Sequence, residues 1–358
     1  MKEKLNTMQL TIFIYMIQSG VIIFSLPRLA AEGYGTNGWI CVPLFSFIVM
    51  ANLLLIYGVY RLGKGQSIFV ILEERLPQKL LFPVYSVLAA FWAVLGAIVA
   101  KQYVMMLKST SLPKTSTTLL LLFIIALSVH LLSKGIYSIV KAGSLFFFLS
   151  IWTVLLWMFN LFEIDLIRLT PFIFKGGHDT FQRSLQIYSA FLGYELCMFF
   201  FPYVDRKQKL FRAFFAGNLI TTFIYTSVSF ISFGFFSLHQ VLSLSYPTIY
   251  LFGYLQSPFL ERVDILLFSF FFPKTLITIV MYYWAAQETL RRMLPGQKPN
   301  VLAIGIAVAS LAVSFIPSIM REVLDWLSLL SNIETLISFG LPLLLIALLV
   351  LRKKQVKA

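Results

Sequence analysis

Ten stretches of predominantly apolar residues, each close to the length of a membrane span, limit what this chain can fold into. A helix needs roughly 20 apolar residues to cross the hydrocarbon core of a bilayer. In lipid, backbone N–H and C=O groups must be satisfied within the protein, so each stretch predicts a transmembrane α-helix. The stretches lie at about 8–30, 39–61, 81–107, 117–133, 143–161, 185–203, 211–236, 264–287, 300–317 and 334–351. The sequence therefore predicts one all-α integral membrane domain over residues 1–358, with ten transmembrane helices.

The composition agrees with a membrane protein and argues against a soluble or nucleic-acid-binding one. Hydrophobic residues make up 59% of the 358 residues and charged residues 12%, more apolar surface than a soluble fold can cover. The formal net charge is +14, but the basic residues occur in short clusters between apolar stretches, as in loops that face anionic lipid. We therefore expect the lipid bilayer as a partner, and no nucleic acid.

The distribution of basic residues predicts the orientation in the membrane. With the N-terminus inside, nineteen of the 29 Lys and Arg residues fall on the cytoplasmic side and eight on the other, with Lys101 and Lys274 inside the spans. Cytoplasmic loops carry the excess of Lys and Arg. An even number of spans then returns the chain to its starting side, which predicts cytoplasmic N- and C-termini.

Ten spans divide into two groups of five, which predicts an internal repeat. A repeat with an odd number of spans inserts its second copy upside down, so an axis in the membrane plane relates the two copies. Repeat one then covers about 8–161 and repeat two about 185–351. In this arrangement the first span corresponds to the sixth.

Both of these spans carry the same kind of interruption. The first reads Gln18-Ser-Gly-Val-Ile-Ile-Phe-Ser-Leu-Pro27, and the sixth reads Phe191-Leu-Gly-Tyr-Glu-Leu-Cys-Met-Phe-Phe-Phe-Pro202. Gly and Pro weaken a helix, through backbone entropy and through a missing N–H. Transporters with inverted repeats bind their substrates at such breaks. The two interruptions therefore predict a small-molecule site between spans one and six.

Three ionisable side chains lie well inside predicted spans, namely Lys101, Glu195 and Lys274. Each is costly in the membrane unless it faces a cavity or a partner. One interpretation is a polar centre in which Glu195 pairs with one lysine and the other lysine attracts a carboxylate or replaces a coupling cation. The alternatives are an ion pair that fixes helix packing and binds nothing, and a Lys101 side chain that extends to the membrane surface.

Further binding groups are expected at the breaks themselves. Backbone N–H groups near Gly20–Ile23 and Gly193–Tyr194 are candidates to hold a carboxylate, as helix N-termini do for anions. The hydroxyls of Thr275 and Thr278 are further candidates, although such hydroxyls also bond back to their own helix. Nothing in the sequence matches a metal site, a nucleotide-binding loop or an activated nucleophile, so we expect no cofactor, no metal and no enzymatic activity.

Two alanines complete the predicted pocket. Ala97 and Ala100 lie within one turn of Lys101 and would leave room for a small ligand, although small residues also serve close helix packing. The predicted ligand-binding residues are Ser19, Gly20, Val21, Ile22, Ile23, Ala97, Ala100, Lys101, Phe191, Gly193, Tyr194, Glu195, Lys274, Thr275 and Thr278.

These features together resemble the B subunit of GerA-type spore germinant receptors. The resemblance rests on the ten spans, on both interruptions, and on the Gly33-Tyr-Gly-Thr-Asn-Gly-Trp39 motif that follows the first. It covers nearly the whole chain. The wider amino acid–polyamine–organocation (APC) transporter superfamily shares a Gly-rich break in the first span, whereas Glu195 after the second break favours the germination branch.

The resemblance implies a LeuT-like 5+5 inverted repeat with broken helices one and six, in the inner membrane of a spore. It further implies an A-type membrane subunit and a C-type lipoprotein subunit as partners, and a small nutrient germinant, commonly an amino acid, as the ligand. In a receptor, the ligand shifts a transporter-like fold between states and the shift passes to the partner subunits. The alternatives are an amino-acid permease coupled to a proton or sodium ion, with Glu195 as a proton site, and a purely structural scaffold.

Overall fold

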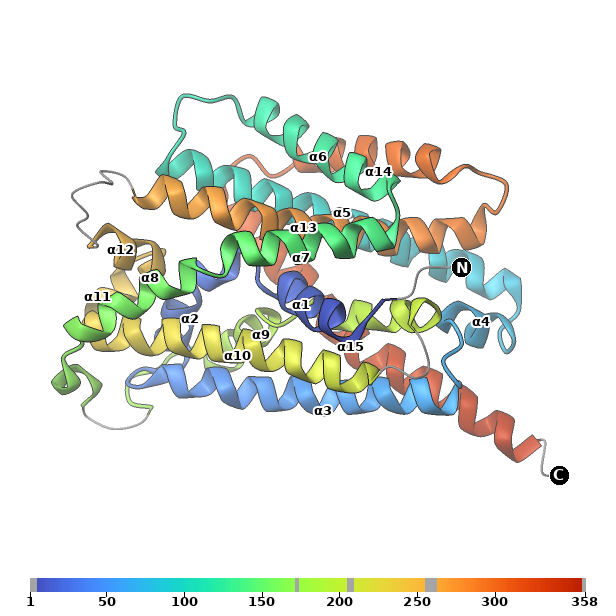
Figure 1. Cartoon of the computed structure of the whole chain (residues 1–358), viewed down its shortest axis with the longest axis horizontal. Helices are drawn as coiled ribbons and strands as arrows, with labels where there is room; N and C mark the ends of the chain where they lie inside the picture. Colours follow the sequence, from blue (N-terminus) through green and yellow to red (C-terminus); the bar gives the residue numbers. More distant parts are fainter. Residues whose placement is uncertain (1–4, 171–173, 205–208, 255–262, 356–358) are drawn as a thin grey trace.

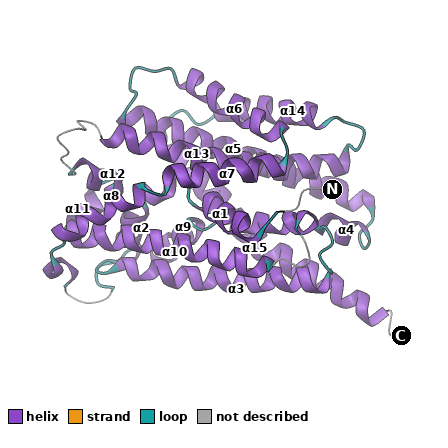
Figure 2. Cartoon of the chain, viewed as in Figure 1, coloured by secondary structure: helices purple, strands orange, loops and turns teal. Residues whose placement is uncertain are grey.

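A computed structural model describes residues 5–170, 174–204, 209–254 and 263–355, and in these residues nearly all regular structure is helical (Figure 2). Pairing of β type is limited, in the same residues, to one isolated bridge between Leu5 and Val204. The long helices are α3 (Cys41–Leu62), α5 (Gln78–Thr110), α6 (Thr117–Ser133), α7 (Ile136–Ser150), α10 (Leu210–Phe235), α13 (Val263–Met293), α14 (Pro299–Ser314) and α15 (Met320–Gln355).

The remaining elements are short. The short α-helices are α1 (Thr7–Gln18), α2 (Leu26–Tyr34), α4 (Ile68–Glu73), α8 (Thr153–Phe159), α9 (Thr180–Ser189), α11 (Leu238–Ser243) and α12 (Pro247–Gly253). The 3₁₀ segments are η1 (Val21–Phe24), η2 (Gly38–Ile40), η3 (Asn160–Glu163), η4 (Leu166–Leu169) and η5 (Tyr194–Tyr203).

Each of the ten predicted stretches falls on one or more of these helical elements. Within the described residues, six helical runs are long and apolar enough to cross a membrane, and α6 and α14 are shorter apolar helices. Some helices extend well beyond the predicted bounds. The largest difference is in α15, which begins at Met320 although the apolar stretch was predicted to begin at residue 334. A helix continues into polar sequence where its neighbours bury one face, so an apolar window underestimates its length.

The first span is broken, as predicted. Its helix α1 starts with a capping box, in which the Asn6 side chain accepts from the Gln9 N–H and the Gln9 side chain accepts from the Asn6 N–H. It ends at Gln18, two non-helical residues follow, and the chain resumes as η1 and α2. Pro27 lies in the first turn of α2, where its missing N–H costs nothing.

The sixth span is broken as well. Helix α9 ends at Ser189, and Gly193 then takes a left-handed φ of +106° before η5 begins. Glycine adopts this conformation without the penalty that a Cβ brings. The second half of the span is 3₁₀ throughout, and Pro202 lies inside it.

Helix α1 occupies the centre of the molecule and brings the breaks to the protein interior. It contacts α7, α10 and α13, while α13 packs along α5, and α15 packs on both α3 and α5 (Figure 1). Eight residues of α1 are buried, including Tyr15, Ile17 and Gln18. The first break is therefore surrounded by protein, which is the setting in which a broken helix is tolerated at membrane depth.

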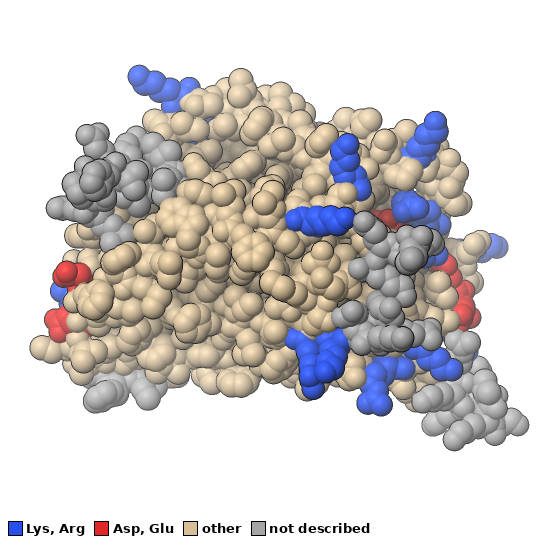
Figure 3. Space-filling view, in the orientation of Figure 1, with Lys and Arg blue, Asp and Glu red and all other residues tan. Residues whose placement is uncertain are grey.

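The two ends of the molecule differ in charge. Helix α4, whose apolar face is buried, lies at the same end as the end of α15, and α11 and α12 lie at the opposite end (Figure 1). Most of the Lys and Arg side chains visible in Figure 3 gather toward the α4 end. This end is below called the α4 end.

Candidate functional site

The side chain of Gln18 joins the two broken spans. Its amide nitrogen donates to the backbone oxygen of Phe191 and to the side-chain oxygen of Asn218, both at 3.0 Å. Its amide oxygen accepts from the Thr221 hydroxyl at 2.8 Å. Gln18 is 2% exposed, so these bonds replace water entirely. Gln18 thereby ties the first break to the second break and to α10.

We expect Gln18→Leu to destabilise the protein by about 2 kcal/mol, because the acceptors on Phe191 and Asn218 would be buried without a donor. The measurement is thermal unfolding of the purified protein in detergent. Gln102→Leu is the matched control, since Gln102 forms no hydrogen bond with the residues that the structure describes. Equal stability of the two variants would show that the Gln18 bonds contribute nothing net.

Side-chain hydroxyls satisfy the backbone oxygens that the first break frees. The Tyr225 hydroxyl donates to the Gln18 oxygen at 2.7 Å, and the Thr248 hydroxyl donates to the Ile23 oxygen at 2.9 Å. These donors come from α10 and α12, two elements distant in sequence from the break. The acceptor side of the break is therefore satisfied by the protein itself.

The two predicted threonines of α13 behave differently from each other. Thr278 donates to the Ile17 oxygen of the broken helix at 3.0 Å and lies 3.3 Å from the Lys274 oxygen of its own helix. Thr275 bonds back to Phe271 at 3.2 Å, which is the alternative that the sequence left open. Thr278 therefore bonds to the end of α1 at the first break, whereas the Thr275 hydroxyl bonds within its own helix.

The donor side of the first break has unused groups beside an open space. A Cβ built on Gly20 meets no atom within 4 Å, and the Gly20 backbone is extended at φ −91°. The Ser19 hydroxyl is buried and has no hydrogen-bond partner in the described part of the chain. Among the described residues, the N–H groups of Val21 and Ile22 also have none. Unpaired donors at the start of a helical segment suit an anionic group such as a carboxylate.

The donor side of the second break is already occupied. The Gly193 N–H donates to both carboxyl oxygens of Glu195, at 2.9 and 2.8 Å. The carboxylate predicted to bind at Gly193–Tyr194 therefore finds the Gly193 N–H taken by the chain's own Glu195. Close packing fills the same place, because a Cβ on Gly193 would lie 2.4 Å from Cγ2 of Ile17.

The predicted pairing of Glu195 with a lysine is wrong. Its carboxyl group lies within hydrogen-bonding reach of that of Glu334 on α15, and the Trp92 indole donates to Glu334 at 3.2 Å. Both Glu195, 2% exposed, and Glu334, 0% exposed, are buried. Sequence reasoning missed Glu334 because it fell at the predicted start of the last span, whereas α15 begins fourteen residues earlier and carries it into the interior. The useful signal was an acidic residue directly before a long apolar run.

The two lysines lie in separate surroundings. The Lys274 ammonium donates to the Tyr15 hydroxyl at 2.9 Å and lies 4.4 Å from the centre of the Phe271 ring, a cation–π distance. Lys101 is 5% exposed and forms neither a hydrogen bond nor an ion pair with the residues that the structure describes. Lys274 is thus held next to α1 by Tyr15 and Phe271, whereas Lys101 is buried without a polar partner among the described residues.

The other predicted residues are interior packing positions. Ala97 and Ala100 are completely buried in α5, the helix that packs along α13. Phe191 is also completely buried and packs against Tyr225, with ring centres 5.5 Å apart. Ile23 is 1% exposed. These four side chains offer no polar groups, and α5, which carries the two alanines, makes its most extensive contacts with α13, α14 and α15 and not with α1.

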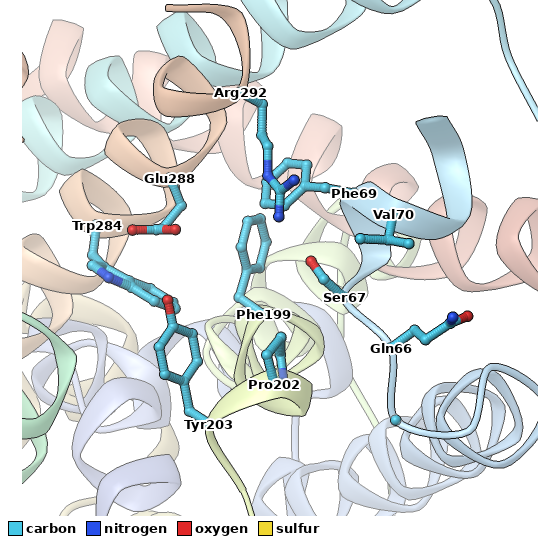
Figure 4. Close-up of a pocket in the computed structure, with 11 residues that line it drawn as sticks. Gln66, Ser67, Phe69, Val70, Phe199, Pro202, Tyr203, Trp284, Glu288 and Arg292 are labelled. Carbon is cyan, nitrogen blue, oxygen red and sulfur yellow. The ribbon is translucent and has the colours of Figure 1, made fainter. Parts of the chain in front are cut away.

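A pocket that the sequence did not predict opens at the α4 end (Figure 4). Its volume is about 360 Å³, within the range of small-molecule sites. Figure 4 shows Trp284, Glu288 and Arg292 extending from α13 and Gln66 and Ser67 from the segment before α4. It is lined by Gly65, Gln66, Ser67, Phe69, Val70, Phe199, Pro202, Tyr203, Trp284, Glu288 and Arg292.

Comparison with known proteins assigns the family. A family model described as "Spore germination protein" matches residues 4–321. The chain belongs to the spore germination protein family. Among similar relatives, Spore germination protein B2 of Bacillus subtilis (strain 168) is 24% identical over 275 residues, 74% of this chain and 73% of that protein. Spore germination protein A2 of the same organism is 25% identical over 315 residues, 85% of each chain. Spore germination protein GerQB of Bacillus cereus is 22% identical over 293 residues, 81% of each.

The fold of this spore germination family member is that of LeuT-like transporters. A Na⁺-coupled sialic acid symporter, solved substrate-bound and outward-open, superposes with a TM-score of 0.68 at 14% identity, over 96% of this chain and 79% of that one. A nucleobase-cation-symport-1 family transporter, solved in a closed conformation with bromovinylhydantoin bound, gives 0.65 at 13% identity, over 93% and 78%. At these identities the likeness concerns the fold. The predicted LeuT-like architecture with broken helices one and six is confirmed.

Proposed function

We propose that this chain is the membrane subunit of a spore germinant receptor and that it binds a small nutrient, an amino acid, at the first break. The observation that carries the proposal is the set of unpaired donors on either side of Gly20 in the chain, namely the Ser19 hydroxyl and the N–H groups of Val21 and Ile22, together with the open space that an added Cβ would meet at Gly20 itself. Three unpaired donors close together in the chain match the carboxylate of an amino acid. Membership of the spore germination protein family supports the biological setting.

In this proposal the first break binds the nutrient, and the second break holds the surrounding helices in place. Glu195 already occupies the amide of Gly193, and Gln18 links the two breaks. A ligand that changes the position of η1 would therefore also shift Phe191, because Gln18 is hydrogen-bonded to it. The shift would pass to an A-type membrane subunit and a C-type lipoprotein subunit, because a ligand that favours one state of the fold changes the population of that state.

We further propose the spore inner membrane as the location, with both termini in the cytoplasm. The gathering of Lys and Arg toward the α4 end supports this orientation, because cytoplasmic loops carry the excess of basic residues. The chain forms one membrane domain, in which repeat one covers about residues 8–161 and repeat two about 185–351.

A permease is the second candidate, since solved structures that share the fold include a Na⁺-coupled symporter and a nucleobase-cation-symport-1 family transporter. We expect proteoliposomes that contain this protein alone to take up no labelled amino acid above empty liposomes, with or without a gradient of protons or sodium ions. Uptake that saturates with substrate concentration would contradict a pure receptor. A known amino-acid transporter reconstituted in parallel is the control for vesicle integrity.

The ligand can be identified genetically. We expect spores that lack this gene to lose germination with one amino acid, or a small set of related ones, and to respond normally to other nutrients. The measurement is the loss of optical density of a spore suspension after each amino acid, sugar or nucleoside is added singly. An unchanged response to every amino acid, together with a lost response to a sugar or nucleoside, would contradict the proposed ligand class.

A further inference from the structure

The contact between Glu195 and Glu334 joins two helical elements that are far apart in the sequence. Glu195 is the second residue of η5, and Glu334 lies well inside α15. Their carboxyl groups lie within hydrogen-bonding reach of each other, and both side chains are buried. An ionised carboxylate only accepts hydrogen bonds. A hydrogen bond between two carboxyl groups therefore requires a proton on one of them.

Counting donors around the pair supports the same requirement. The Gly193 N–H serves both oxygens of Glu195, and the Trp92 indole serves Oε1 of Glu334. No N–H or hydroxyl donor of the described residues reaches Oε2 of Glu334, which is buried. A buried carboxyl oxygen without any donor is costly, and a proton shared with the neighbouring carboxyl group removes that cost.

In the part of the chain that the structure describes, no basic group offsets the charge of the pair. Among the described residues, neither Glu195 nor Glu334 forms an ion pair. The titratable groups that face them are phenols and a thiol from three elements: Tyr194 and Cys197 on η5, Tyr188 on α9 and Tyr282 on α13. Two adjacent negative charges in such surroundings would repel each other strongly, because the low local polarity does little to screen them.

We propose that Glu195 and Glu334 form a proton-binding site, in which one shared proton fastens the broken sixth span to α15. With the proton in place, the two carboxyl groups bond across the η5–α15 contact. Without it, two like charges push the same elements apart. Neither the family membership nor the nutrient-binding proposal assigns this role, and the site stands whether or not Gly20 binds a ligand.

A second polar link between η5 and α15 lies next to the carboxyl pair, so the proton affects how firmly these two elements are held together. Asn52 of α3 donates to the Tyr194 hydroxyl at 2.6 Å and to the Ser338 backbone oxygen at 2.9 Å. Tyr194 is the neighbour of Glu195, and Ser338 lies one turn after Glu334. The shared proton and the Asn52 side chain thus form two neighbouring links between η5 and α15. If the proton is lost, the hydrogen bonds of Asn52 are the link that remains.

The test is infrared spectroscopy of the purified full-length protein near neutral pH, in ordinary and heavy water. A protonated carboxyl group has a C=O stretch that an ionised one lacks. We expect one such band, shifted in heavy water, and its complete loss in both Glu195→Gln and Glu334→Gln. In each variant the Gln amide donates to the remaining carboxylate, so no proton is needed. Glu322→Gln is the matched control, because Glu322 is also on α15 and its carboxylate accepts from the Ser318 N–H at 2.7 Å.

Each outcome of this experiment either supports the shared proton or overturns it. Loss of the band in the two Gln variants, with the band intact in Glu322→Gln, supports the shared proton. Absence of the band from the unmodified protein, or its survival in either Gln variant, overturns the proposal. If one variant fails to accumulate, the other still decides. Because the measurement needs no nutrient, its failure is distinguishable from failure of the proposed receptor function.

Discussion

Spores that carry Gly20→Val are expected to lose the nutrient response of this receptor while the protein accumulates normally in the membrane. The valine side chain would occupy the open space beside Gly20 and shield the Ser19 hydroxyl and the free N–H groups of Val21 and Ile22. The fold should tolerate it, because the Gly20 backbone is extended at φ −91° and a Cβ there meets no atom within 4 Å. Optical density of spore suspensions measures the response, and immunoblots of spore membranes measure the amount of protein.

Gly305→Val is the matched control for this substitution. Gly305 lies on α14, is exposed, and also has open space around an added Cβ, but it is not part of either break. We expect this variant to respond like the unmodified receptor. A normal response in Gly20→Val spores would place the nutrient elsewhere in the molecule. A lost response in both variants would point to a general effect of added bulk.

Gly193→Ala is expected to fail for a different reason, by destabilising the fold. Gly193 has φ +106°, and an added Cβ would lie 2.4 Å from Cγ2 of Ile17 in the interior. Left-handed strain together with overpacking should cost at least about 2 kcal/mol. We expect a lower thermal unfolding temperature for the purified protein and less protein in the membrane, whether or not a nutrient is present.

The control for Gly193→Ala separates strain from overpacking. Gly135 also has a left-handed backbone, φ +79°, but an added Cβ there has nothing within 4 Å. Gly135→Ala should therefore lower the unfolding temperature less than Gly193→Ala. If the two variants unfold at the same temperature, the close approach of Gly193 to Ile17 does not contribute to stability.

Much of the fold follows from patterns that a sequence makes visible. Apolar runs predict helices because lipid leaves the backbone no other partner, and the ten predicted stretches all fall on helical elements. The Gly-to-Pro interruptions predict the breaks because both residue types weaken a helix, although Pro27 turned out to begin a helix and not to end one. Helix ends were predicted less well, since burial against neighbours extends α15 beyond its apolar core.

The chemistry of the site was predicted less completely, because it depends on which side chains meet across helices. Nothing in the sequence distance between Glu195 and Glu334 indicates that they touch. The sequence does not indicate that Gln18 bonds to Asn218 either. A Gln next to a break does, however, indicate that a polar partner is needed. The pocket at the α4 end combines residues from three distant segments, so no local pattern could have predicted it.

The most direct test of the central claim is equilibrium binding of labelled amino acids to the purified protein in lipid nanodiscs. We predict saturable binding of the amino acid that triggers the gene-dependent germination response, loss of that binding in Gly20→Val, and full binding in Gly305→Val. Amino-acid amides, which lack the carboxylate, should not compete. Equal binding of the germinant to the unmodified protein and to Gly20→Val would contradict a nutrient site at the first break.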